Sequence, residues 1–235
     1  MKLTRKLIPA MIMLLVSAVL MSTASFAWFA MNTEVTATGM EVTAKAGDIF
    51  LEIKGTEDGE TWKTIGTNAV DAELYPVAHE ESITAAELDT ASKWFYYYSD
   101  DINNHEKADG ATKDTVSVFA DYVAKTSYTV RLNSNMVTTA YDLYVSEVTL
   151  PANTGITLIV KCGEKFKEFK NGGTFNWTAD TDNIADTMSD SELTVDVYLY
   201  IDGENANVKT SNVAALTGAV SFKLSASAAQ RVATP

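Results

Sequence analysis

Hydrophobic and polar residues alternate with a period of two along most of the chain after residue 34. The clearest run is Leu193–Ile201, in which aliphatic side chains alternate with Thr194, Asp196, Tyr198 and Tyr200. This period is typical of half-buried strands, because successive side chains point to opposite faces of a sheet. Shorter runs of the same kind include Met40, Val42, Ala44; Leu51, Ile53; Tyr128, Val130, Leu132; Tyr141, Leu143, Val145; and Val220, Phe222, Leu224, Ala226. The pattern predicts an all-β fold, an antiparallel β-sandwich.

Turn and helix signals interrupt this pattern. Asp-Gly pairs at 58–59 and 202–203 favour tight hairpins, since both residue types tolerate positive φ. Thr84 and Glu87 form a capping-box pattern that predicts a short helix through about Ala91. A further helical turn is expected over 180–189, and a long exposed loop over 100–114. No repeat or Pro- or Gly-rich linker divides residues 39–235, so we expect one sandwich domain there.

The N-terminus has the features of an export signal. Lys2, Arg5 and Lys6 precede an almost wholly apolar stretch over 7–21, and small residues Ser25 and Ala27 then fit a signal-peptidase site. We expect cleavage after Ala27, so that 1–27 is a signal peptide and Trp28 starts the mature chain. The alternative is an uncleaved membrane anchor, because no charge interrupts 7–33. Either reading places the rest of the chain outside the cell, secreted or at the cell surface.

Composition and charge narrow the class of partners. The chain has 235 residues, 46% of them hydrophobic, which is enough to bury a core without disulfide or metal support. Its formal net charge is -13, and removal of the three early cations would make it -16. Such a chain repels polyanions, so no nucleic-acid partner is expected.

The residues available for chemistry are few. Cys162 is the lone cysteine and lies on the apolar face of the run 156–162, so we expect a buried thiol, with an intermolecular disulfide or a reactive thiol as alternatives. His79 begins a segment like the zinc-protease motif H-E-x-x-H, but Ile83 replaces the second histidine. The only other histidine, His105, lies in the polar loop. We therefore expect no metal, no cofactor and no enzymatic activity.

Two segments leave a binding role open. Acidic residues at 180, 182, 186 and 190 superficially suggest a calcium loop, but the glycine and terminal glutamate of an EF-hand are missing, which favours a solvated acidic loop. The aromatic run 94–98 is expected to be a strand shared between core and surface, with a glycan-stacking platform as the alternative.

The segments 24–30 (ASFAWFA), 37–42 (ATGMEV) and 197–205 (VYLYIDGEN) carry a resemblance to a known family. The first two resemble the N-terminal junction, and the third a hairpin, of the TasA/camelysin family of secreted fibre-forming proteins. The usual aspartate after the aromatic pair is absent, since Ala30, Met31 and Asn32 stand there. The resemblance implies a jelly-roll sandwich, processing by a signal peptidase, and a biofilm-matrix filament with an accessory or anchoring subunit.

It also implies assembly by donation of a β-strand. The mature N-terminus of one subunit, residues 28–38, would be exposed and would pair with a neighbouring copy, giving an open head-to-tail polymer. Trp28, Phe29, Val35 and Ala37 are the candidate donor residues. Two other functions compete with this one: a membrane-tethered or secreted binding module for glycan or protein, and a metalloprotease, which the incomplete zinc motif makes weakest.

N-terminal sequencing of the protein at the cell surface tests the expected processing. Cleavage after Ala27 gives a first residue of Trp28, because the small side chains of Ser25 and Ala27 fit the peptidase pocket. A first residue of Met1 would instead show that the apolar segment is retained as an anchor.

Overall fold

The computed structural model describes residues 36–46, 51–55, 61–98, 112–133, 138–170, 173–176, 183–189, 192–206, 208 and 219–227. The chain divides into two parts, residues 1–34 and 35–235. All of the described residues lie in the second part, and the expected signal segment therefore lies outside them.

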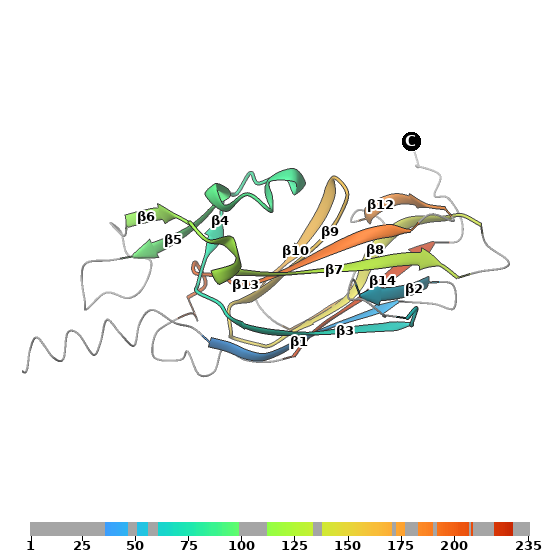
Figure 1. The fold of residues 1–235 in the computed structure, drawn as a ribbon, viewed down its shortest axis with the longest axis horizontal. Coiled ribbons are helices and arrows are strands. Elements are labelled where there is room, and N and C mark those ends of the chain that lie inside the picture. The colour runs from blue at the N-terminus through green and yellow to red at the C-terminus, as the bar shows by residue number, and fades with distance from the viewer. Residues whose placement is uncertain are drawn as a thin grey trace, which may run out of the picture. The chain divides into compact units, whose positions relative to one another are not determined.

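The described residues form two large sheets and one small one (Figure 1). The six-stranded sheet has the order β11 (Gly173–Asn176), β8 (Ala140–Leu150), β14 (Val220–Ser227), β1 (Thr36–Ala46) and β3 (Ile65–Glu73), and β12 (Asn183–Met188) also pairs with β8. The five-stranded sheet has the order β10 (Lys165–Phe169), β9 (Ile156–Cys162), β13 (Leu193–Ile201), β7 (Val123–Leu132) and β2 (Leu51–Gly55). The small sheet contains β4 (Ala78–His79), β5 (Trp94–Tyr98) and β6 (Thr112–Thr115).

The all-β prediction is confirmed, with one difference in strand direction. The paired strands are antiparallel except β1 and β14, which run parallel in a register that places Val42 opposite Val220. Where the structure describes burial, most residues on the alternating face are buried, as a period of two requires; examples are Leu51 and Ile53, Tyr128 and Val130, and Val220, Phe222 and Leu224. The first and last described strands therefore lie side by side in the six-stranded sheet.

The two large sheets share one hydrophobic core. Inward side chains of β13 and β9 lie in the same buried cluster as those of β14 and β8. Phe222 of β14, 1% exposed, meets the ring of Tyr128 of β7 edge to face at 6.0 Å between centroids. Cys162 is 7% exposed in this core, which confirms the expected buried thiol, and burial raises its pKa.

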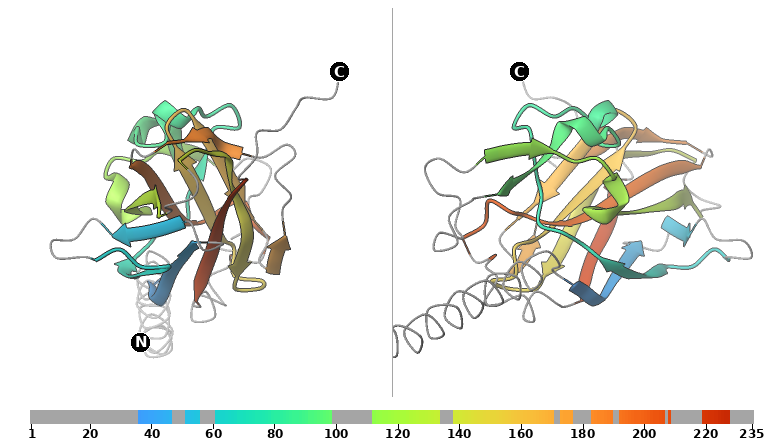
Figure 2. Two further views of the ribbon diagram at one scale, coloured as in Figure 1. Left: turned by 90° about the vertical axis from the view of Figure 1, so that its right-hand side faces the viewer. Right: turned by 60° about the vertical axis from the view of Figure 1, so that its left-hand side comes forward.

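The other face of the five-stranded sheet is also covered. The small sheet and the 3-10 turns η1 (Ala85–Glu87), η2 (Ala91–Lys93) and η3 (Phe119–Asp121) lie over it; we call them the cap layer. In the right-hand view of Figure 2 the small sheet, η1 and η2 lie in the upper part of the picture, while β1 and β3 lie in the lower part. A second buried cluster joins Trp94 of the cap layer to Ile159, Tyr198 and Tyr200. The part of this sheet around Ile159, Tyr198 and Tyr200 is therefore buried on both faces.

The helix predictions had mixed outcomes. The Glu87 carboxylate accepts a hydrogen bond from the backbone N–H of Thr84, as a capping box predicts, and it also accepts one from the Thr84 hydroxyl. The segment nevertheless forms only the short turns η1 and η2, since its apolar residues Ala85 and Leu88 pack into the cap layer before the chain enters β5.

The helical turn predicted over 180–189 is wrong. Residues Asn183–Met188 form strand β12, paired with β8, and Ile184 and Met188 are buried in the main core. The predicted loop 100–114 is also wrong at its end, because Thr112–Thr115 form β6 against β5; residues 100–111 lie outside the described residues. The first correction depends on β8, which is distant in the sequence, and the second depends on β5, the preceding strand; local turn signals report neither pairing.

The substitution Phe222→Ala tests the shared core. Removing this ring leaves a cavity against Tyr128 and should lower the free energy of unfolding by about 3–5 kcal/mol. Ser221→Ala, on the opposite face of the same strand, serves as the control and should change it by about 0.5 kcal/mol or less. Denaturant unfolding of the two variants gives the comparison, and equal losses would contradict the sandwich arrangement.

Candidate functional site

The signal-cleavage candidates Ser25, Ala27 and Trp28 lie outside the described residues, and so do the donor-strand candidates Trp28, Phe29 and Val35. Ala37 is described, and it lies in β1 opposite Ala72 of β3 in the same chain. The final residues of the expected exposed segment 28–38 are therefore paired within their own sheet. A donor segment must end before Thr36, where β1 begins.

The ends of the two large sheets differ in charge. Strand β3 ends the described order of the six-stranded sheet, and its first six residues, Ile65 to Val70, carry no charge. The five-stranded sheet ends at β10, which contains Lys165, Lys167 and Glu168, and at β2, which also contains charged residues. Charged side chains on an edge strand oppose pairing with another chain. The fourth end, β11, also carries no charge but has only four residues, so β3 offers the longer uncharged edge for an added strand.

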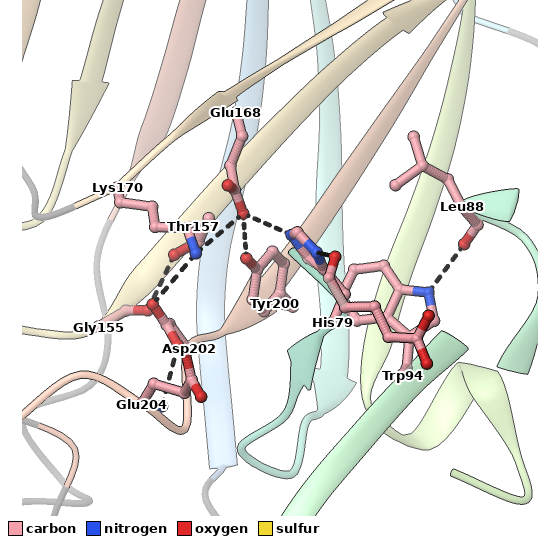
Figure 3. Close-up of polar contacts among 11 residues, drawn as sticks. His79, Leu88, Trp94, Gly155, Thr157, Glu168, Lys170, Tyr200, Asp202 and Glu204 are labelled. Carbon is pink, nitrogen blue, oxygen red and sulfur yellow. Dashed lines mark hydrogen bonds and ion pairs between the residues drawn. The ribbon is translucent and has the colours of Figure 1, made fainter. Parts of the chain in front are cut away.

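A buried polar cluster lies where the cap layer meets the five-stranded sheet (Figure 3). Its centre is His79 of β4, whose side chain is only 8% exposed. His79 Nε2 lies 2.8 Å from Glu168 Oε1 of β10, and Nδ1 lies 2.8 Å from the backbone oxygen of Glu80. When Glu168 is ionised, both ring nitrogens thus face oxygen atoms that can accept a hydrogen bond but cannot donate one.

Glu168 is shared by donors from three directions. The Tyr200 hydroxyl of β13 donates to the Oε1 atom that also faces His79, and Lys170 Nζ lies 3.3 Å from it. Lys170 Nζ also lies 3.6 Å from Asp202 Oδ2, and Asp202 Oδ1 accepts the backbone N–H of Glu204. The cluster therefore ties the cap layer to β10 and to the end of β13, where Val77 and Asp202 form a parallel bridge.

Aromatic rings surround the imidazole. The His79 ring meets Trp94 edge to face at 5.1 Å and Tyr200 at 6.0 Å between centroids. Trp94 is fully buried, and its indole N–H donates to the backbone oxygen of Leu88 at 3.0 Å. The ion pair of His79 and Glu168 is thereby shielded from water on its cap side.

The environment shifts both pKa values toward the charged pair. Burial alone would lower the pKa of His79, but the hydrogen bonds with Glu168 and Glu80 outweigh it and raise the pKa above its usual 6.5. Burial alone would raise the pKa of Glu168, but hydrogen bonds from His79 and Tyr200 hold it below its usual 4.5. Burial and the Glu168 carboxylate together raise the pKa of Tyr200 well above its ordinary value.

A second, more exposed cluster lies on the same face of the sheet. Asp89 accepts hydrogen bonds from Lys125 at 2.9 and 3.0 Å and from the Tyr198 hydroxyl at 3.1 and 3.2 Å. The Asp89 side chain is 45% exposed, against 21% for Glu168. Water therefore competes for Asp89 more than for Glu168.

Neither cluster has the arrangement of a hydrolytic or metal centre. Within the described ranges, the two hydrogen-bond partners of the His79 ring are Glu168 and the Glu80 backbone, neither of them a serine or cysteine, and no three His, Cys, Asp or Glu side chains gather as metal ligands would. Of the calcium candidates, Asp186 pairs with Lys165 at 2.5 Å, while residues 180, 182 and 190 lie outside the described residues. The described part of the chain contains no helix with the length and hydrophobicity of a transmembrane span.

The sequence did not identify the His79 cluster. His79 and Glu168 are 89 positions apart, and no local motif links them. Their only sequence signal was that the run 193–201 carries two tyrosines on the side opposite its aliphatic residues.

Comparisons of the chain with protein-family models, with curated proteins and with solved structures gave no match.

Two tyrosines of β13 give a matched test of the buried cluster. Tyr198 and Tyr200 are both fully buried and both donate to a carboxylate. Tyr200→Phe should lower the free energy of unfolding by about 1.5–3 kcal/mol, because it removes a hydrogen bond to a mostly buried charge. Tyr198→Phe should cost about 1 kcal/mol or less, since Asp89 is half exposed. Equal costs in denaturant unfolding would contradict the ranking of the two clusters.

Proposed function

We propose that the chain is a secreted cell-surface structural protein, a subunit of an extracellular filament or biofilm-matrix fibre. In this proposal, the chain folds as a jelly-roll sandwich, a signal peptidase cuts after Ala27, and the new N-terminus donates a strand to a second copy. The observation that carries it is the position of β1. This strand begins at Thr36, shortly after the donor candidates Trp28, Phe29 and Val35 in the sequence, and it lies next to the end strand β3, whose first six residues carry no charge.

The proposed acceptor is the outer edge of β3. A strand added there would extend the six-stranded sheet by main-chain hydrogen bonds, with alternate donor side chains covering the core edge. Donor and acceptor are different surfaces of one subunit, so the contact is heterologous and gives an open filament. The partners are thus further copies of this chain, with an accessory or anchoring subunit at one end; no catalytic activity is part of the proposal.

A second candidate function is a binding module for glycan or protein, and one observation favours it. Three partly exposed tyrosines form a ladder on the cap layer: Tyr122 stacks on Tyr96 at 5.7 Å and meets Tyr75 at 5.5 Å between centroids. Val118, four residues before Tyr122 in the chain, is 51% exposed. Aromatic platforms of this kind can stack on sugar rings.

A pair of N-terminal truncations tests the proposed assembly. Protein beginning at Trp28 should form filaments visible by electron microscopy, whereas protein beginning at Thr36 should stay monomeric, because it lacks the donor segment but keeps all of β1. A truncation at Gly39 would be less clean, since it also removes Thr36 and Ala37, which pair with β3.

The matched control replaces Trp28 and Phe29 by serine in the longer protein, which keeps the chain length and removes two proposed anchors. This variant should assemble at a much higher protein concentration than the parent. Filaments formed equally well by the protein beginning at Thr36 would contradict strand donation. A monomeric parent that binds polysaccharide would favour the second function.

A further inference from the structure

The two contacts of the His79 ring can both be hydrogen bonds only if the ring carries two protons. A carbonyl oxygen and an ionised carboxylate accept but do not donate, and each lies 2.8 Å from one ring nitrogen. A neutral imidazole would turn a lone pair toward one of these oxygen atoms. The geometry therefore fits the imidazolium and disfavours the neutral ring.

The position of the ring makes this proton important for the cap layer. His79 belongs to β4, whereas Glu168 and Tyr200 belong to two strands of the five-stranded sheet. Close by, the Val77 N–H donates to the Ile201 oxygen at 2.9 Å and the Gly203 N–H donates to the Val77 oxygen at 3.0 Å. The imidazolium and these backbone bonds hold the same edge of the cap layer.

We propose that His79 is a pH-sensitive latch, whose protonated ring fastens the cap layer to the five-stranded sheet and whose deprotonation loosens it. The latch opens as the pH rises. Opening would uncover the apolar outer face of that sheet, where Ile159, Tyr198 and Tyr200 now contact the cap layer. This inference does not depend on the proposed filament function.

The charged groups around the ring set the pH range. Glu168 faces it from β10 and favours the imidazolium, whereas Lys170, the residue after β10, opposes it. The Tyr200 hydroxyl from β13 donates a hydrogen bond to Glu168, and the Asp202 carboxylate forms an ion pair with Lys170 at 3.6 Å. On the cap side, the Glu80 carboxylate lies 3.3 Å from Lys93, while the Glu80 backbone oxygen accepts from the ring.

The sign follows from the two pKa values. The pKa of His79 is raised on folding, so its contribution is complete below about 6.5 and is lost as the pH rises through the folded value. The pKa of Glu168 is lowered, so its contribution is complete above 4.5 and is lost as the pH falls through the folded value. The cap layer is therefore held most firmly between these limits, in mildly acidic solution.

The test measures the His79 pKa and the opening of the cap layer in the full-length chain. With only two histidines, His79 and His105, NMR titration of the ring signals is assignable through a His105→Gln variant. The His79 pKa should lie above 6.5 and should fall in Glu168→Gln. Hydrogen exchange of the Val77 amide, corrected for the intrinsic effect of pH, gives the opening constant of the cap layer. Between a pH below 6.5 and a pH above the folded His79 pKa, this constant should rise in total by about tenfold for each unit by which folding raises that pKa.

Two variants separate the latch from general instability. In His79→Gln the opening at Val77 should no longer increase as the pH rises above about 6.5, while His105→Gln should keep the full dependence. A His79 pKa at or below 6.5 in the unaltered chain would overturn the proposal even if the His79 variant fails to fold. The same pH dependence at Val77 in His79→Gln and in the parent would also overturn it.

Discussion

Strand β13 buries side chains on both of its faces, and the arrangement of the other described strands follows from this constraint. On one face, Val195, Val197, Leu199 and Ile201 close the core between the two large sheets. On the other face, Tyr198 and Tyr200 must also leave water, and the cap layer covers them. A strand with two buried faces must pair on both edges, and β13 lies between β9 and β7. Without the cap layer, two large aromatic side chains would lie on an open surface.

The polar groups of the cap interface follow from the same constraint. A tyrosine that is buried needs a partner for its hydroxyl, and both tyrosines of β13 donate to carboxylates. Glu168, which receives the Tyr200 hydroxyl, then needs a counter-charge, which His79 and Lys170 supply. The His79–Glu168 ion pair is thus mostly buried, at the interface between the cap layer and the five-stranded sheet. Because of this position, the protonation of one ring affects how firmly the whole cap layer is held.

The sequence predicted the strands well because a period of two is a local signal. The runs at 128–132, 156–162, 193–201 and 220–226 all lie in strands, and the buried thiol of Cys162 followed from the same periodicity. The failures have a common cause. Local signals over 180–189 favour a helical turn where β12 forms, because they do not report the pairing with β8, some 40 residues earlier, that buries this strand. No local motif predicts the His79 cluster, because its members meet only after β4, β10 and β13 are assembled. The exposed segment predicted over 28–38 overlaps the start of β1, because the pairing of that start with β3 is a contact between residues far apart in the sequence.

Nuclear Overhauser effects between aromatic rings give the clearest test of packing on both sides of the five-stranded sheet. This packing predicts two sets of cross-peaks in one sample at mildly acidic pH. One set joins Tyr128 to Phe222 in the sandwich core, with centroids 6.0 Å apart, and the other joins Trp94 to Tyr200 and His79, with centroids 5.0 and 5.1 Å from Trp94. Cross-peaks from the first set alone would contradict it, because they would show a sandwich whose outer tyrosine face is not covered by the cap layer.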